Sequence, residues 1–192
     1  MPETQLPTDV EQVIVEKEIG DWLEKVVIGL NLCPFAKRPF DEKRIRIRVD
    51  ACKQESLAFE SIVHELQILD ETDVKSLETT VLVLPKLFSD FEDYNDFLFA
   101  ANELIVLKGW EGTYQIASFH PEYQFAGTDK SDAENFTNRA PYPVFHLIRE
   151  ASLSAAIANY PDVSAIPERN IALMNDFSEA DLKHYFSWCF KV

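Results

Sequence analysis

The chain has 192 residues, of which 46% are hydrophobic and 27% are charged, and this balance predicts one globular domain over residues 1–192. Fourteen Phe, six Tyr and three Trp exclude an intrinsically disordered chain, and only five Gly exclude a collagen-like repeat. No apolar stretch approaches the ~20 residues that cross a bilayer, and residues 1–4 lack the basic flank of a signal peptide. We therefore expect a cytoplasmic protein whose first nine residues are frayed.

The charge balance excludes some classes of binding partner. The chain carries 18 Lys and Arg against 33 Asp and Glu, which gives a formal net charge of −15. Such a charge repels phosphate backbones and anionic membranes at long range, so we expect neither a nucleic acid nor a membrane as partner. The oligomeric state leaves no signal in the sequence and is left open.

The elements follow from the spacing of apolar residues. A spacing of three to four residues from Val15 to Leu30 predicts a first helix over residues 10–30, which Pro34 ends. The later segments predict, in chain order, a strand over 44–49, a helix over 55–70, a buried central strand over 79–84, a helix over 91–105, a strand over 114–119, a helix over 143–159 and a last helix that begins near 167.

The order of these elements predicts the fold class. Each connection between consecutive strands has about 30 residues, which suits a crossover helix between parallel strands. We therefore expect an α/β fold with a β-α-β-α-β core, in which a three-stranded, mainly parallel sheet carries N-terminal and C-terminal helices. Arg44, Arg46 and Arg48 alternate with apolar residues in the first strand, and we interpret them as protection of a sheet edge rather than as a site for an acidic ligand.

A polar segment of about 20 residues follows the third predicted strand, and long loops inside compact domains are more often functional than idle. Ligands of open parallel sheets bind beyond the carboxyl ends of the strands, where His120 opens this segment. Because imidazole titrates near neutrality, we predict His120 as a general acid/base. The alternative is a strand-end histidine that a local hydrogen bond holds in place. Tyr123 and Gln124 are predicted beside it as substrate-binding residues.

The second half of this segment suits an anion. Asn138 and Arg139 precede a predicted helix, whose first N–H groups are unpaired and whose dipole favours negative charge. We predict that Arg139 clamps a carboxylate or phosphate with Asn138 beside it, and an ordinary surface arginine is the alternative. On that helix His146, Arg149 and Glu150 fall opposite the buried stripe. His146 is therefore a further candidate catalytic residue, and Arg149 a further candidate for substrate binding.

Two histidines and two carboxylates in this region admit a divalent metal as an alternative cofactor. His146 and Glu150 are four residues apart on the predicted helix, and His120 and Asp132 complete a set of four ligands. A solvated pair on a helix surface is the simpler interpretation of His146 and Glu150. No metal ligand is therefore firm.

The three cysteines, Cys33, Cys52 and Cys189, have no regular spacing, which fits reduced thiols and excludes a disulfide scaffold. Cys33 follows the first predicted helix, and most free cysteines are small buried apolar residues. A nucleophile needs a stabilised thiolate, which a helix C-terminus opposes and the nearby Lys37 favours. The connection that carries Cys33 is long enough to reach His120 but does not require it.

Several short motifs occur in an order that is specific to one known family. They are Trp22 with VIGLNLCPFA at 27–36, DYNDF at 93–97, SFHPEYQFAG at 118–127, NFTNRAPYP at 135–143 and ERNI at 168–171. Through them residues 15–175 resemble a bacterial family of domains of unknown function, number fourteen-fifteen in that series. The family has no established activity, so the resemblance implies a shared site but no reaction. The family positions that it places in this site are Cys33, His120, Asn138, Arg139, His146, Arg149 and Glu150.

Three functions are compatible with these residues. The first is an enzyme, a hydrolase or transferase, that acts on a small anionic substrate with His120 as acid/base, Arg139 as anion clamp and Cys33 as nucleophile or redox thiol. The second is a non-catalytic module that binds a metabolite or a peptide. The third is a metal-dependent hydrolase or oxygenase that uses His120, His146 and Glu150. We expect His120 and Arg139 to line one common hollow.

Overall fold

The computed structural model describes residues 9–190, and its centre is a four-stranded mixed sheet in the order β1-β2-β4-β3. The strands are β1 (Ile45–Val49), β2 (Thr79–Val83), β3 (Tyr114–Phe119) and β4 (Val144–Arg149). β1 and β2 are parallel, whereas β4 is antiparallel to both β2 and β3. The predicted α/β class is confirmed, but the sheet has a fourth strand and only one parallel pair of neighbours.

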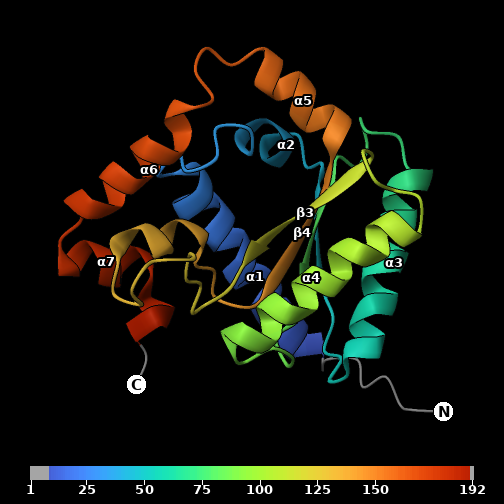
Figure 1. Cartoon of the computed structure of the whole chain (residues 1–192), viewed down its shortest axis with the longest axis horizontal. Coiled ribbons are helices and arrows are strands. Elements are labelled where there is room, and N and C mark those ends of the chain that lie inside the picture. Colours follow the sequence, from blue (N-terminus) through green and yellow to red (C-terminus); the bar gives the residue numbers. More distant parts are fainter. Residues whose placement is uncertain (1–8, 191–192) are drawn as a thin grey trace.

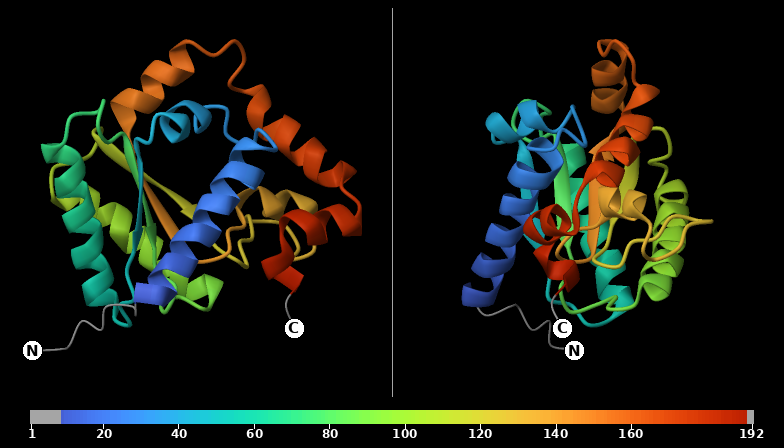
Figure 2. Two further views of the ribbon diagram at one scale, coloured as in Figure 1. Left: turned by 180° about the vertical axis from the view of Figure 1, so that it is seen from behind. Right: turned by 90° about the vertical axis from the view of Figure 1, so that its left-hand side faces the viewer.

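Helices cover both faces of this sheet and give the molecule three layers (Figures 1 and 2). One face carries α1 (Asp9–Trp22), the π-helix η1 (Leu23–Ile28) and α2 (Lys37–Asp41), and the other carries α3 (Glu55–Glu71) and α4 (Phe91–Leu107). The later elements are the 3-10 helix η2 (Ala133–Asn138), α5 (Glu150–Ala158), α6 (Ala165–Asp176), α7 (Glu179–Tyr185) and the 3-10 helix η3 (Ser187–Phe190). Of the segment expected to be frayed, residues 1–8 lie outside the described residues, and Asp9 begins α1. Between residues 9 and 190, none of the helices combines the length and apolar character that crossing a membrane requires.

An apolar cluster on each face of the sheet joins the layers. Val81 and Val144 belong to the cluster on the α1 side, and Leu82 and Phe145 to the cluster on the side of α3 and α4. Because side chains alternate along a strand, β2 contributes to both clusters and is buried along its whole length. This confirms the predicted central strand, and β1 lies at a sheet edge as its arginines predicted.

Carboxylates hold the arginines of β1. Arg46 Nε lies 2.8 Å from an oxygen of Glu65, whose side chain is only 1% exposed, and Arg48 Nε lies 3.8 Å from the same carboxylate. Arg44 pairs with Glu42 and Glu78. A buried carboxylate needs such partners, so these ion pairs account for the basic strand without a ligand.

The predicted helix over 143–159 is wrong in its first half. Residues 144–149 form β4 between β2 and β3, and only residues 150–158 are helical. Val144, Phe145 and Leu147 are all 0% exposed. A strand buried on both faces is a nearly continuous apolar run, and its spacing does not distinguish it from a buried helix. As a result His146, Arg149 and Glu150 do not share one helix face.

The first predicted helix, over 10–30, changes its winding halfway. α1 gives way after Trp22 to η1, whose wider turns bring the N–H of Gly29 to within 2.9 Å of the carbonyl oxygen of Glu24. A Cβ atom at Gly29 would lie 2.3 Å from the carbonyl oxygen of Lys25, so only glycine fits without a backbone shift. Such π-helical turns are frequent at functional sites, and this one leads directly into the turn that carries Cys33.

We expect Gly29→Ala to lower the free energy of unfolding by about 2 kcal/mol, because the overpacked backbone has to move. Gly20→Ala is the matched control, since a Cβ atom there meets nothing within 4 Å and alanine favours the helix. Urea denaturation of the two variants and the parent measures the difference. Equal unfolding midpoints for Gly29→Ala and Gly20→Ala would contradict this account of η1.

Candidate functional site

His120 is buried at the carboxyl end of β3, and the backbone occupies both of its ring nitrogens. Nε2 lies 2.8 Å from the carbonyl oxygen of Phe88, and the N–H of Glu122 donates to Nδ1 at 3.0 Å. Because Nδ1 accepts, the proton is on Nε2 and is donated to the Phe88 carbonyl. Burial lowers the pKa of His120, which keeps the ring neutral. The alternative of a strand-end histidine held by local hydrogen bonds accounts for these contacts, and no ring nitrogen remains for a substrate.

Arg139 is also turned inward, with 9% of its surface exposed. Its guanidinium lies 4.2 Å from the centre of the Phe136 ring and donates to the carbonyl oxygens of Lys130 at 2.8 Å and Tyr123 at 3.4 Å. Burial lowers the pKa of Arg139. These contacts fasten the loop before η2 to η2 itself, so the donors predicted to clamp an anion bind backbone oxygens instead.

The other predicted residues of this loop make similar contacts. Asn138 donates to a carbonyl oxygen of β3 at 3.1 Å, and Gln124 donates to the carbonyl oxygen of Thr128 at 2.5 Å. The ring of Tyr123 packs on Phe91 of α4 with centroids 5.1 Å apart. The polar side chains of the segment therefore serve largely to hold its own backbone.

The sheet separates His120 from Cys33. His120 packs against Phe91 and Tyr94 on the α4 side, with centroids 5.4 and 5.1 Å apart, whereas Cys33 packs against the apolar cluster on the α1 side. Neither His120 nor Arg139 lines any of five cavities found among residues 9–190. The hollow that we expected these two side chains to share is not among them.

The predicted set of four metal ligands is wrong. His146 lies within β4, and Glu150 begins α5 at the end of the strands opposite to His120. Asp132 accepts a hydrogen bond from the N–H of Asp129 at 2.9 Å. Within the part of the chain that the structure describes, no three metal-ligating side chains come together. The predicted pairing of His146 with Glu150 rested on a helix that is a strand.

A cavity of about 120 Å³ on the α1 side of the sheet brings together three predicted residues, Cys33, His146 and Arg149. We call it the inner cavity. Most of its wall is apolar and includes Leu23, Val27, Phe35, Ile45, Val81, Phe119, Ile148, Leu153 and Ala156. Its other polar side chains are Glu78, Thr79 and Ser152. This combination of apolar walls and a few polar groups is typical of a small-molecule site.

Thr79 determines that Nε2 of His146 carries a proton. The Thr79 hydroxyl oxygen lies 2.5 Å from the carbonyl oxygen of Leu147 and 2.7 Å from Nε2 of His146. A carbonyl oxygen can only accept a hydrogen bond, so the hydroxyl donates to it. The hydroxyl oxygen then accepts a hydrogen bond from the Nε2–H of His146. Nδ1 of His146 is then an acceptor without a hydrogen-bond partner among residues 9–190. Burial lowers the pKa of His146 to about 4, so the ring is neutral at neutral pH.

Cys33 is half-buried in the turn between η1 and α2. Burial raises the pKa of its thiol, and hydrogen bonds from the backbone N–H groups of Phe35 and Ala36 lower it by less. Asn170 of α6 holds the turn, because its side-chain amide donates to the carbonyl oxygen of Leu32 at 2.7 Å. The resting thiol is therefore protonated, and two backbone N–H groups are placed to stabilise negative charge on its sulfur.

The other two cysteines do not line the inner cavity. Burial raises the pKa of Cys52 to about 12 and that of Cys189 to about 11. The Cys189 thiol donates to the carbonyl oxygen of Pro121 at 3.6 Å. We therefore expect both thiols to react slowly, and they serve as internal controls for Cys33.

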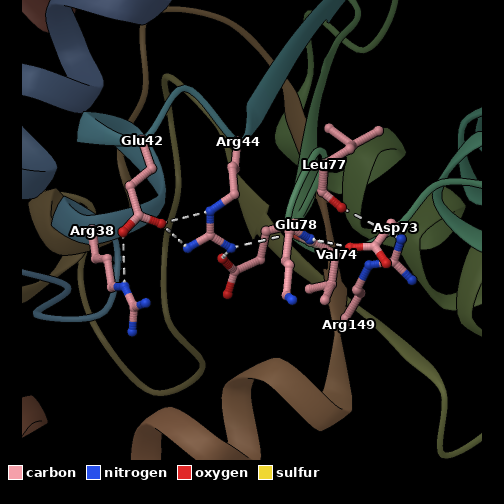
Figure 3. A network of polar contacts seen from close by, with 9 residues as sticks. Arg38, Glu42, Arg44, Asp73, Val74, Leu77, Glu78 and Arg149 are labelled. Carbon is pink, nitrogen blue, oxygen red and sulfur yellow. Dashed lines mark hydrogen bonds and ion pairs between the residues drawn. The ribbon is translucent and has the colours of Figure 1, made fainter.

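Arg149 also lines the inner cavity, but its guanidinium lies on the α3 face of the sheet, beside a chain of ion pairs (Figure 3). Its guanidinium donates to carbonyl oxygens at and beyond the end of α3, those of Leu69, Thr72 and Leu77, where a helix favours a cation. Its Nε is buried without a hydrogen-bond partner among residues 9–190. None of the ion pairs of these residues includes Arg149, whereas the neighbouring Glu78 is paired with Arg44.

A larger hollow of about 540 Å³, the outer groove, adjoins the inner cavity. It lies between η1, η2 and α6, which are neighbours in Figure 1. Val27, Cys33 and Phe119 line both hollows. The remaining lining is Leu32, Phe125, Glu134, Thr137, Asn138, Ile166, Pro167, Asn170 and Ile171. Cys33 is therefore the one thiol that lines either hollow, and it lines both.

Sequence reasoning missed Thr79, Ser152 and Asn170 as parts of this region. Thr79 reaches His146 only through the pairing of β2 with β4, and Asn170 reaches the Cys33 turn only through the packing of α6. Neither contact leaves a local signal in the sequence. The one available clue to Asn170 is its place in the ERNI motif at 168–171, which the family resemblance included.

Comparison with known proteins identifies a family without an assigned activity. The model of DUF1415, described as a protein of unknown function, matches residues 14–184. A search of curated proteins and a search of solved structures found no match. The match confirms the family resemblance carried by the motifs, and the function has to be argued from the geometry.

Proposed function

We propose that this chain, which belongs to the DUF1415 family of proteins of unknown function, is an enzyme that acts on a small anionic substrate in the inner cavity. Cys33 is the nucleophile, and His146, rather than the predicted His120, accepts the thiol proton. One observation carries the proposal. A single cavity is lined by a thiol and by a neutral imidazole whose Nδ1 has no hydrogen-bond partner among the described residues.

The protonation states suit a thiol that is activated during the reaction. A neutral imidazole with a free Nδ1 accepts a proton, and the N–H groups of Phe35 and Ala36 stabilise the sulfur once it becomes negative. The pKa of His146 is low because of burial, so proton transfer is unfavourable while no substrate is bound. An anion bound beside the ring favours imidazolium, which raises the pKa of His146 and makes the ring a better base.

Arg149 supports an anionic substrate. Its guanidinium lies on the α3 face of the sheet and its hydrogen bonds go to neutral oxygens, so its charge favours an anion in the cavity through its electric field and not by direct contact. The apolar walls strengthen this attraction, because charges interact more strongly away from water. In this proposal neither Arg139 nor Arg149 clamps the anion directly, and the charge of Arg149 favours an anion only at a distance.

Alkylation of Cys33 tests the proposal with two reagents of equal size, neutral iodoacetamide and anionic iodoacetate. At pH 8 we expect Cys33 to react before Cys52 and Cys189, whose pKa values are about 12 and about 11. We expect the ratio of the iodoacetate rate to the iodoacetamide rate to be about tenfold higher at Cys33 than at the cysteines of the urea-unfolded protein, which corresponds to ~1.4 kcal/mol. Peptide mapping by mass spectrometry gives the rate at each cysteine.

The variant His146→Leu tests whether Cys33 reacts because His146 assists it or only because its thiol is accessible. We expect it to slow the alkylation of Cys33 about tenfold or more, since a positioned base contributes at least that much. His64→Leu is the matched control, because His64 is exposed on α3, and it should change nothing. A Cys33 that reacts no faster than Cys189, or that loses no rate in His146→Leu, would overturn the proposed role.

A non-catalytic binding module is the second candidate, and the resting protonation states favour it. Burial raises the pKa of Cys33 and lowers that of His146, so the cavity presents two neutral groups. A protein that only binds a small anion predicts the same preference for iodoacetate over iodoacetamide. It predicts no loss of alkylation rate in His146→Leu, which is where the two candidates differ.

A further inference from the structure

The outer groove combines a largely apolar wall with a single charged residue. Its volume of about 540 Å³ falls in the range of small-molecule pockets. Apolar side chains from three segments of the chain form the wall, among them Leu32 after η1, Phe125 before η2 and Ile171 of α6. Among residues 9–190, Glu134 is the one charged residue that lines this groove.

The geometry of η2 turns Glu134 toward the groove. A 3-10 helix has three residues per turn, so residues three apart lie on the same face. Glu134 and Thr137 are three apart, line the groove and are half-buried, whereas Asn135 and Phe136 between them are buried in the protein. None of the ion pairs of residues 9–190 includes Glu134. A carboxylate beside an apolar wall attracts a cation more strongly than a carboxylate in open water does.

The other polar side chains of the groove are bound to the protein itself. Thr137, Asn138 and Asn170 each donate a hydrogen bond to a backbone carbonyl oxygen, at 2.8, 3.1 and 2.7 Å respectively. Within the part of the chain that the structure describes, no Lys, Arg or His lines the groove. The formal net charge of −15 also attracts cations to the molecule at long range. A ligand in the groove therefore meets one negative charge and an otherwise apolar surface.

We infer that the outer groove is a binding site for an organic amine. The ammonium group pairs with the carboxylate of Glu134, and the apolar part of the amine lies along Leu32, Ile166 and Ile171. This inference goes beyond the proposed function, because it needs neither the inner cavity nor a reaction of Cys33. It assigns a second ligand, of opposite charge, to the hollow that adjoins the inner cavity.

Unbranched alkylamines test the inference, because their amino groups resemble that of lysine and are protonated at pH 7. Titration of the ¹⁵N-labelled protein, followed by its amide chemical shifts, gives the dissociation constants. We expect hexylammonium to bind about tenfold more tightly than 1-hexanol, which has the same chain without the charge. We expect it to bind about tenfold more tightly than butylammonium, since each methylene group removed from water contributes up to roughly fourfold. Hexanoate should bind most weakly, and the largest shifts should occur in η2 and the first half of α6.

The variant Glu134→Gln tests the ion pair, because it removes the charge and keeps the size of the side chain. We expect it to weaken the binding of hexylammonium about tenfold and to leave the binding of 1-hexanol unchanged. Glu103→Gln is the matched control, since Glu103 is exposed on α4 and lines none of the five cavities. Both substitutions change the net charge equally, so any difference between them is specific to the groove.

The variant Ile166→Gln tests the apolar wall. It places a polar side chain in the groove, and we expect it to remove most of the gain in affinity from butylammonium to hexylammonium. Ile157→Gln is its control, because Ile157 is 38% exposed on α5 and does not line the groove. The comparison of hexylammonium, 1-hexanol and hexanoate on the unchanged protein stands without any variant.

Three outcomes would overturn the inference. Equal affinities for hexylammonium and 1-hexanol would show that the groove does not select a cation. Equal losses in Glu134→Gln and Glu103→Gln would assign the preference to the net charge of the chain and not to Glu134. Chemical shifts that change only away from η2, α6 and the Cys33 turn would place the amine elsewhere. The alkylation rate of Cys33 tests the proposed function separately, so the failure of one does not imply the failure of the other.

Discussion

His120→Leu is expected to lower the free energy of unfolding by about 3 kcal/mol and to leave the alkylation rate of Cys33 unchanged. Leucine preserves apolar packing against Tyr94 and Phe91, but it leaves the carbonyl of Phe88 and the N–H of Glu122 without partners. Each buried polar group that loses its partner costs ~1–3 kcal/mol. Urea denaturation and Cys33 peptide mapping of the same preparation measure the two effects.

His64→Leu is the control for this prediction, since the same substitution at an exposed position should change stability by less than about 0.5 kcal/mol. The opposite pattern, a stable His120→Leu protein whose Cys33 reacts slowly, would restore the general acid/base role that the sequence suggested for His120.

Acidification is expected to destabilise the protein through His146. Burial lowers its pKa from 6.5 in the unfolded chain to about 4 in the folded one, so between these values the unfolded state binds a proton that the folded state does not. The contribution of His146 is fully present above pH 6.5 and is lost as the pH falls towards 4. At ~1.4 kcal/mol for each pKa unit, the loss amounts to about 3 kcal/mol.

The variant His146→Leu isolates this effect, because leucine has no proton to bind. Denaturation curves of the parent and of the variant between pH 7 and pH 4 should diverge by about 3 kcal/mol over the range. The pKa of His120 is lowered in the same direction, and its contribution cancels because both proteins keep it. If the free energies of unfolding of the two proteins changed equally with pH, protonation of His146 would not destabilise the folded state.

The way in which each strand is covered determined whether its pattern of apolar residues marked it as a strand. The arginines of β1 alternate with apolar residues because one face meets ion-pair partners and the other meets the core, and β2 is short, β-branched and bounded by Pro85, so both were recognised. β4 is buried by strands on both sides and by helices on both faces. Its apolar run therefore lost the alternation that marks a strand, and the fourth helix was predicted in its place.

Residues of the candidate site could be named from the sequence, but which of them lie together could not be predicted from it. Cys33 and His146 were each named, yet they line one cavity only because β4 lies beside β2 and the Cys33 turn lies over the α1 face. For His120 and Arg139 the residue type can be read from the sequence, but the hydrogen-bond partners of the side chain cannot. In sequence, a polar side chain that holds a loop cannot be distinguished from one that binds a substrate. Here both His120 and Arg139 bind backbone oxygens of loops.

β4 is the last strand in the sequence but lies between β2 and β3 in the sheet, so the inner cavity cannot form before β4 has been synthesised. A nascent chain that ends before residue 144 carries the thiol but neither the imidazole nor the strand that joins β2 to β3. In such a fragment β2 and β3 present unpaired backbone groups, which invites association with other chains. Assembly of the proposed pair of Cys33 and His146 is thereby tied to closure of the sheet, and in an incomplete polypeptide the thiol has no histidine beside it.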